Sequence, residues 1–238
     1  MKQLPEEQVL DPGRFMDYEK TVVDSRLLDR ALRVIRGPDL RVCDVGGATG
    51  VFLDALEARS AHGIECTVMD LSGAYRQHLV NERLVFKQAS IVDNDTADGT
   101  YDLVTARHVL HHLVGSTEKT TIALQRKAIE EMVRITKPGG FVLIEEHVNR
   151  VKLFSRVIYY ASRFTNQWGL RWGYFEVGRV VVKFMTPGEL TGMVADVANA
   201  SSARIVEAEY HKREVGLRWK LTQLMAYAGD QLCVIERA

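Results

Sequence analysis

Short apolar runs of strand length alternate with longer amphipathic stretches along most of this chain. Several runs are rich in Val and Ile, as strands are. Between them, residues 21–36 and 118–136 place apolar side chains on one helical face, and Pro138 with the two glycines after it ends the second helix. The alternation favours a mainly parallel sheet with helices on both faces. The predicted strands are residues 40–45, 65–70, 83–88, 101–106, 140–146, 203–210 and 231–238.

The carboxyl-terminal part of the chain departs from this alternation. The last two runs have no clear helix between them, and we expect them to pair in antiparallel fashion at one edge of the sheet. The prediction for residues 1–238 is a single doubly wound α/β domain with its ligand site at the carboxyl ends of the strands. Residues 1–36 are expected to form an amino-terminal helical cover.

Residues 148–184 form an insertion between the fifth strand and the helix that begins near Thr186. One interpretation is a lid that lines an apolar substrate pocket, and this is the one we adopt as the prediction. A separate hydrophobic cluster and a membrane-facing amphipathic segment, suggested by Arg156 and Arg163 among apolar residues, stay open. The aromatic residues that motivate all three are Tyr159, Tyr160, Trp168, Trp172 and Tyr174.

Composition excludes several classes of protein. The 238 residues carry no net charge, so there is no electrostatic argument for nucleic acid as a partner. The three cysteines include no CxxC pair, which argues against a disulfide framework or a cysteine zinc site. The first residues contain no apolar signal-peptide core, and no apolar run is long enough to span a membrane. We therefore expect a cytoplasmic protein without stable membrane insertion.

A glycine-rich loop follows the first strand directly. The segment CDVGGATG spaces Gly46, Ala48 and Gly50 as GxAxG, which is not the GxGxxG fingerprint of dinucleotide-binding proteins. Asp44 precedes the loop, where an acid would repel phosphate groups but suits a cationic amine. A ligand with an ammonium group and a ribose, and without phosphate, is S-adenosylmethionine.

A second acid fits the same ligand. Asp70 ends the next strand, 20 residues after Gly50. Its two carboxylate oxygens can accept hydrogen bonds from both ribose hydroxyls. Alone, Asp70 is as well explained as a turn residue or helix cap, but its register with the glycine loop and Asp44 favours a cofactor site.

These segments together resemble the class I S-adenosylmethionine-dependent methyltransferases of the small-molecule, O-methyltransferase-like type. DVGGATG is similar to their DxGxGxG motif, MDLS to the ribose-binding acid, YDLVTARHVLHHL to the fourth strand with its following helix, and KPGGFVLIEE to the turn into the fifth strand. The resemblance covers residues 40–147. It implies a mostly parallel, seven-stranded Rossmann-like sheet with an antiparallel edge strand. The implied cofactor-binding residues are Asp44, Gly46, Gly47, Ala48, Gly50, Asp70, Leu71, Ser90, Ile91 and Arg107.

Two positions depart from the family pattern. Ala48 replaces the middle glycine of the motif, where a methyl group is small enough to fit. Ser90 stands where many members have an acid that contacts the adenine amino group, and Asp93 is the alternative for that contact. These departures bear on the adenine contacts and leave the fold prediction unchanged.

Three histidines lie after the fourth strand, and at helical spacing His108 would share a face with His111 and His112. RHVLH resembles the segment of plant-type O-methyltransferases whose histidine is the general base, and that histidine falls on His111 here. Helix packing and a metal site completed by His147 or a nearby acid are the alternatives; we predict no metal. The expected catalytic residues are His111, Glu145 and His147, with one of the groups at 145–147 orienting His111 or binding substrate.

The function predicted from the sequence is methyl transfer from S-adenosylmethionine to a small, largely apolar or aromatic metabolite. An oxygen acceptor and a natural-product tailoring step in secondary metabolism are expected, and a homodimer is left open. One alternative is a methyltransferase-fold protein that catalyses a non-methylating rearrangement or acts as a partner subunit. A nicotinamide oxidoreductase is opposed by Asp44 and by the missing dinucleotide fingerprint.

Overall fold

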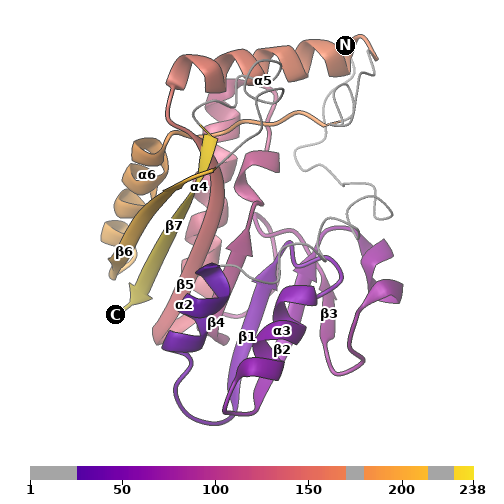
Figure 1. Cartoon of the computed structure of the whole chain (residues 1–238), viewed down its shortest axis with the longest axis vertical. Coiled ribbons are helices and arrows are strands. Elements are labelled where there is room, and N and C mark those ends of the chain that lie inside the picture. Colours follow the sequence, from indigo (N-terminus) through magenta and orange to yellow (C-terminus); the bar gives the residue numbers. More distant parts are fainter. Residues whose placement is uncertain (1–25, 170–179, 214–227) are drawn as a thin grey trace.

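The computed structural model describes residues 26–169, 180–213 and 228–238, and a seven-stranded sheet forms its centre (Figure 1). The strand order is β3-β2-β1-β4-β5-β7-β6. The strands are β1 (Leu40–Val45), β2 (Ile64–Asp70), β3 (Val85–Gln88), β4 (Tyr101–Arg107), β5 (Thr136–Asn149), β6 (Ala203–Lys212) and β7 (Ala228–Arg237). The helices are α2 (Arg26–Val34), α3 (Val51–Arg59), α4 (Glu118–Ile135), α5 (Lys152–Gln167) and α6 (Pro187–Ala200), with short 3₁₀ helices η1 (Gly73–His78) and η2 (Leu110–His112).

The predicted doubly wound, mostly parallel sheet is confirmed. Strands β1 to β5 are parallel, and β7 pairs antiparallel with both β5 and β6. The antiparallel strand is therefore second from the edge, and β6 itself runs in the same direction as β5. The sequence pattern also placed the start of β5 too late, because the strand begins at Thr136 and includes the Pro–Gly turn.

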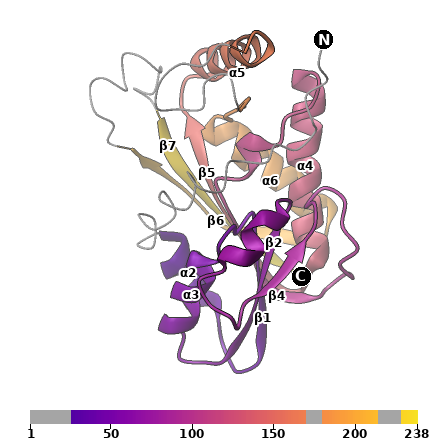
Figure 2. The same cartoon turned by 90° about the vertical axis from the view of Figure 1, so that its right-hand side faces the viewer.

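Two apolar layers cover the sheet, one on each face (Figure 2). On one face, α4 and α6 bury Ile129, Met132 and Val194. On the other face, α2 and α3 bury Leu28 and Leu53. The described part of the predicted amino-terminal cover, α2, is thus a packed helix of the sheet layer, and residues 1–25 lie outside the described residues.

Local sequence explains where the helices begin. Thr117 caps α4, and its Oγ1 accepts a hydrogen bond from the N–H of Thr120. Thr186 caps α6 in the same way through Glu189, with Pro187 in the first turn. None of the described helices is long and apolar enough to cross a membrane.

The helix predicted after β4 is wrong. The chain forms only the short helix η2, and His108 adopts a left-handed conformation with φ of 56°. The N–H of His108 donates to the carbonyl oxygen of Glu145, 2.8 Å away, which turns the chain toward β5. His108 therefore does not share a helical face with His111 and His112.

Gly50 ends the glycine loop in a conformation that disfavours any side chain. Its φ is 79°, and an added Cβ would lie against Leu84 Cδ1 and 3.1 Å from Val68 Cγ2. We expect Gly50→Ala to lower the free energy of unfolding by about 2–4 kcal/mol, because backbone strain and overpacking add. Urea denaturation measures this change.

Gly192→Ala is the matched control. Gly192 lies in the exposed interior of α6, with nothing within 4 Å of an added Cβ. The same substitution there is expected to stabilise the protein by up to about 1 kcal/mol. An equal response of the two variants would contradict the role assigned to Gly50.

Candidate active site at the carboxyl edge of the sheet

The glycine loop is closed against the end of β2 by hydrogen bonds. The N–H of Gly46 donates to the carbonyl oxygen of Met69 at 2.7 Å, and the N–H of Ala48 donates to Asp70 Oδ2 at 3.2 Å. Ala48 has a φ of 44°, so it keeps the left-handed conformation that a glycine adopts more easily. The methyl group of Ala48, which replaces the middle glycine of the family motif, is thus accommodated in a conformation that favours glycine.

Asp44 lies buried beneath this loop. Its Oδ1 accepts a hydrogen bond from Thr105 Oγ1 at 2.6 Å, which joins β1 to β4. A Cβ added at Gly47 would lie 2.8 Å from Asp44 Oδ2, so position 47 has no room for a side chain. The carboxylate thus fixes the loop from below in addition to carrying negative charge at the site.

Asp70 has the hydrogen-bonding pattern expected of a residue that binds a ribose. Oδ1 accepts from the N–H of Ser72 at 2.8 Å, and Oδ2 accepts from Ala48. Burial raises the pKa of this carboxyl, and the two N–H groups act in the opposite direction. Each oxygen of an ionised carboxylate has a second lone pair, which fits the two hydroxyls of a ribose.

The predicted adenine contacts are positioned by the turn after β3. Ser90 Oγ accepts from the N–H groups of Val92 and Asp93 at 3.1 and 3.3 Å, so it shapes this turn. Ile91 is buried, and Asp93 is exposed. Leu71 lies beside the same turn, where its carbonyl oxygen accepts from Gln88 Nε2 at 3.3 Å.

Arg107 and Glu145 are paired in register at the ends of β4 and β5. The guanidinium of Arg107 lies over the Phe52 ring, 5.8 Å from its centre, in the first turn after the glycine loop. Glu145 is buried, and burial together with the charge of Asp230 raises its pKa to about 7, against the opposing charges of Arg107 and Arg26. This carboxyl therefore exchanges its proton near neutral pH.

His111 and Glu146 form a buried pair. His111 Nδ1 lies 2.6 Å from Glu146 Oε1, and Glu146 Oε2 accepts from the N–H of Leu110 at 2.6 Å. Burial raises the pKa of Glu146, but His111, His108 and His147 together outweigh this effect, and the pKa lies below its ordinary value. An ionised Glu146 can only accept a hydrogen bond, so Nδ1 of His111 carries the hydrogen and Nε2 of the neutral ring has a free lone pair that can bind a proton.

Glu146 does not face the same side of the sheet as its neighbours. Side chains alternate along a strand, so Glu145 and His147 point to the face covered by α2, and Glu146 points to the face of η2 and α4. The sequence had grouped all three at one mouth. The structure separates them and makes Glu146 the partner of His111.

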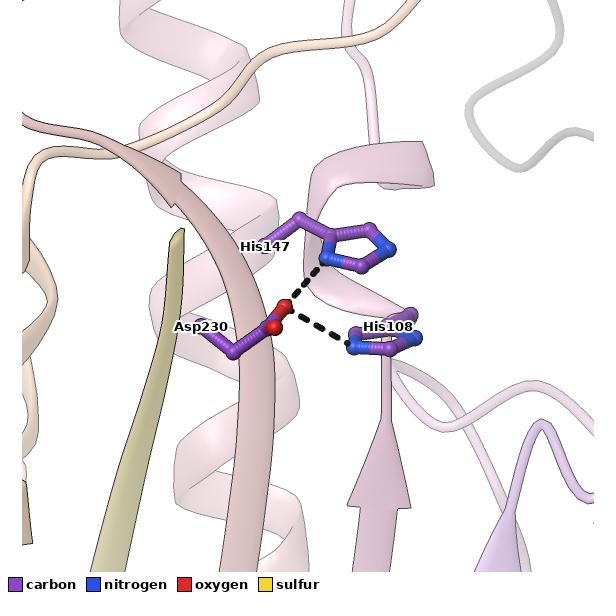
Figure 3. A group of neighbouring side chains, drawn as sticks. All are labelled: His108, His147 and Asp230. Atoms are coloured by element: carbon purple, nitrogen blue, oxygen red, sulfur yellow. Dashed lines mark hydrogen bonds and ion pairs between the residues drawn. The ribbon is translucent and has the colours of Figure 1, made fainter. Parts of the chain in front are cut away.

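His147 lies instead in a cluster that spans three segments (Figure 3). Its Nδ1 is 2.5 Å from Oδ1 of Asp230 on β7, and its ring stacks on His108 with centres 3.4 Å apart. Burial and the neighbouring His108 lower the pKa of His147 to about 3. Sequence reasoning missed Asp230, because the strand was predicted to begin one residue after it.

A shallow depression lies beside this cluster, and its empty volume of about 270 Å³ includes open solvent. His147 and Phe184 line it, and both rings lie near that of His111, at 5.6 and 5.1 Å between ring centres. The remaining lining residues are Val148, Asn149, Ile158, Arg213, Ala228 and Gly229. His111 itself is buried and does not line the depression, but it lies directly behind the rings of His147 and Phe184.

The insertion at 148–184 contributes only part of this lining. Helix α5 buries Tyr159 but leaves Tyr160, Phe164 and Trp168 more than half exposed, with 66% of Trp168 accessible. Trp172 and Tyr174 lie outside the described residues. The lid therefore stays a prediction.

Sequence comparison relates the chain to small-molecule methyltransferases. It is 29% identical over 119 residues to a demethylmenaquinone methyltransferase of Clavibacter sepedonicus, covering 49% of this chain and 44% of the relative. It is 27% identical over 139 residues to the ajmaline N-methyltransferase of Rauvolfia serpentina, covering 52% and 44%. The chain thus spans about half the length of the curated relatives it matches.

Solved structures share the fold at low sequence identity. An S-adenosylmethionine-dependent methyltransferase from Methanosarcina mazei is 14% identical, with a TM-score of 0.62 over 86% of this chain and 95% of that one. The [4+2]-cyclase SpnF is 15% identical, with a TM-score of 0.60 over 89% and 80%. The likeness to both shows the fold alone.

A family model described as a methyltransferase domain matches residues 15–197, which is most of the chain. The matched range includes the glycine loop, Asp70, His111 and Glu146. S-adenosylmethionine, predicted from the sequence, is the cofactor expected for this family and is confirmed at that level. The chain belongs to the methyltransferase-domain family.

Proposed function

We propose that this protein transfers a methyl group from S-adenosylmethionine to an oxygen of a small, largely apolar or aromatic metabolite. The observation that carries the proposal is the His111–Glu146 pair, which lies next to the two rings, His147 and Phe184, that line the depression. The glycine loop and Asp70 lie at the same edge of the sheet as this pair. Methyl transfer requires this, because the methyl donor and the acceptor molecule must bind next to each other.

The residues that would hold the cofactor are those at the ends of β1, β2 and β4. Asp70 would accept hydrogen bonds from the ribose hydroxyls. The backbone of the loop at Gly46 and Gly47 would lie close to the methionine part of the cofactor. Arg107 would lie at the methionine end, and the turn at Ser90 and Ile91, with Leu71, would contact the adenine. When bound, the cofactor supplies a methyl group on a sulfonium, which is a good leaving group.

His111 would act on the acceptor. With Nδ1 held by Glu146, its Nε2 would take the proton of an acceptor hydroxyl, and Glu146 would stabilise the imidazolium that forms. His147 borders the acceptor, and Glu145 lies behind it as a second group that titrates near neutral pH. Positioning of the two reactants supplies most of the remaining acceleration.

Oxygen is favoured over nitrogen because of this base. An amine attacks through its free lone pair and needs no proton acceptor, whereas a phenol or alcohol must lose its proton. The names of the two curated relatives, one an N-methyltransferase, support a small-molecule acceptor and leave its atom to experiment. A tailoring step in secondary metabolism, a cytoplasmic location and a homodimer stay predictions from the sequence.

The test is transfer of labelled methyl groups to a panel of matched phenols, alcohols and amines. We expect label in the phenols and stoichiometric release of S-adenosylhomocysteine. Label in amines alone would replace the oxygen assignment. Tight binding of the cofactor with no transfer to any acceptor class would favour a non-methylating reaction, which the fold of the [4+2]-cyclase shows to be compatible with this architecture.

A further inference from the structure

Three side chains converge beside the depression, and the methyl-transfer proposal gives none of them a proton to take or hold (Figure 3). They are His108 after β4, His147 near the end of β5 and Asp230 near the start of β7. His147 and Asp230 are direct partners in the antiparallel β5–β7 pair, so their side chains lie on the same face. One ligand atom from each of the three lies within 4.8 Å of the other two.

The conformation of His108 indicates that this convergence is specific. A non-glycine residue in the left-handed region is uncommon, and such residues gather at functional sites. This backbone brings the His108 ring parallel to His147, with 16° between the ring planes. His108 Nε2 is buried and lies 3.4 Å from Asp230 Oδ1, a long contact for a hydrogen bond or ion pair.

We propose that His108, His147 and Asp230 bind a divalent transition-metal ion of the zinc, cobalt and nickel class. Two imidazole nitrogens and one carboxylate oxygen are the ligands that these ions prefer, whereas magnesium and calcium prefer oxygen alone. Three protein ligands leave at least one coordination position open. Because His147 also lines the depression, an oxygen of a small molecule bound there can fill that position.

The spacing of the ligand atoms suits an ion after a small rearrangement. Ligands about 2.0–2.1 Å from a tetrahedral ion are roughly 3.4 Å apart, the distance already found between His108 Nε2 and Asp230 Oδ1. The His147 Nδ1 to Asp230 Oδ1 distance of 2.5 Å is that of a shared proton and must lengthen when an ion replaces the proton. A rotation of the Asp230 carboxylate allows this change. One imidazole must also turn out of the present stack, because a metal ion binds in the plane of each ring and the two rings now lie parallel with centres 3.4 Å apart.

The positive charge of Arg213 lies close to His147 and is expected to weaken the binding of a metal ion. Its guanidinium lies 3.4 Å from His147 Nε2 and is itself exposed. Once Nδ1 binds a metal, Nε2 carries a proton and faces a second donor. Removing this cation is therefore expected to tighten metal binding, which a purely structural role for the three groups does not predict.

Cobalt titration of the full chain, without cofactor or acceptor, tests the proposal. We expect one Co²⁺ per chain with visible absorption bands of a four- or five-coordinate site, displaced by Zn²⁺. Asp230→Asn, which preserves shape, and His108→Ala are expected to weaken binding by about 100-fold or more, since even indirect partners of a metal ligand contribute 10–100-fold. Arg213→Ala is expected to tighten it.

His62→Ala is the matched control, because His62 is an exposed histidine outside the cluster. Thermal unfolding confirms that each variant is folded. The proposal is overturned if the folded wild type binds no Co²⁺, or if Asp230→Asn and His62→Ala bind it equally well. Since the readout uses no methyl donor, its failure leaves the proposed methyl transfer untouched, and the reverse also holds.

Discussion

Asp70→Ala is expected to bind S-adenosylhomocysteine about 100-fold or more weakly than the wild type, because two hydrogen bonds to a charged acceptor are lost. The carboxylate is positioned for this by Ser72 and Ala48, whose N–H groups hold one oxygen each. Isothermal titration calorimetry measures the change directly.

Two further variants show whether a loss of affinity in Asp70→Ala comes from the ribose contact. Asp70→Asn keeps the shape of the side chain and removes its charge, so it separates loss of the ribose contact from loosening of the glycine loop. Asp196→Ala removes an exposed carboxylate from α6, whose contacts are to the opposite half of the sheet, and should bind like the wild type. Wild-type affinity in Asp70→Ala would show that the cofactor lies elsewhere.

His111→Ala is expected to lower kcat for a phenolic acceptor by about 10²–10⁴-fold, the range of a single general base. The affinity for S-adenosylhomocysteine should stay unchanged, because His111 contacts the acceptor side of the site. Added imidazole should restore part of the activity to this variant. Restoration would be absent if His111 only packs the segment after β4.

Glu146 is a positioning residue in this scheme, and its replacement carries a separate cost. It is 1% exposed and also accepts backbone hydrogen bonds from Leu110 and His147, so Glu146→Gln should both destabilise the protein and lower kcat. The activity of the folded fraction therefore has to be compared with that of His78→Ala, an exposed histidine control. Full activity in folded Glu146→Gln would exclude the pair as the base.

Local sequence patterns determined much of this protein. Periodicity gave the strands and the helices α2 and α4, because apolar side chains repeat every two residues in strands and about every 3.6 in helices. The glycine loop and Asp70 were predictable from spacing, since both follow strands that run parallel and end at one edge. The resemblance to methyltransferases rested on these same segments and was confirmed by the family match.

Only the tertiary structure decided which polar groups meet. Glu146, and neither of its neighbours, pairs with His111, because alternation along β5 turns it to the face where η2 lies. Asp230 joins His147 through the register of two strands that are distant in sequence. Such contacts depend on strand pairing and on the left-handed conformation of His108, and no periodicity within one segment encodes them. The sequence therefore determined the fold and the segments predicted to bind the cofactor, and long-range register determined which polar groups lie beside them.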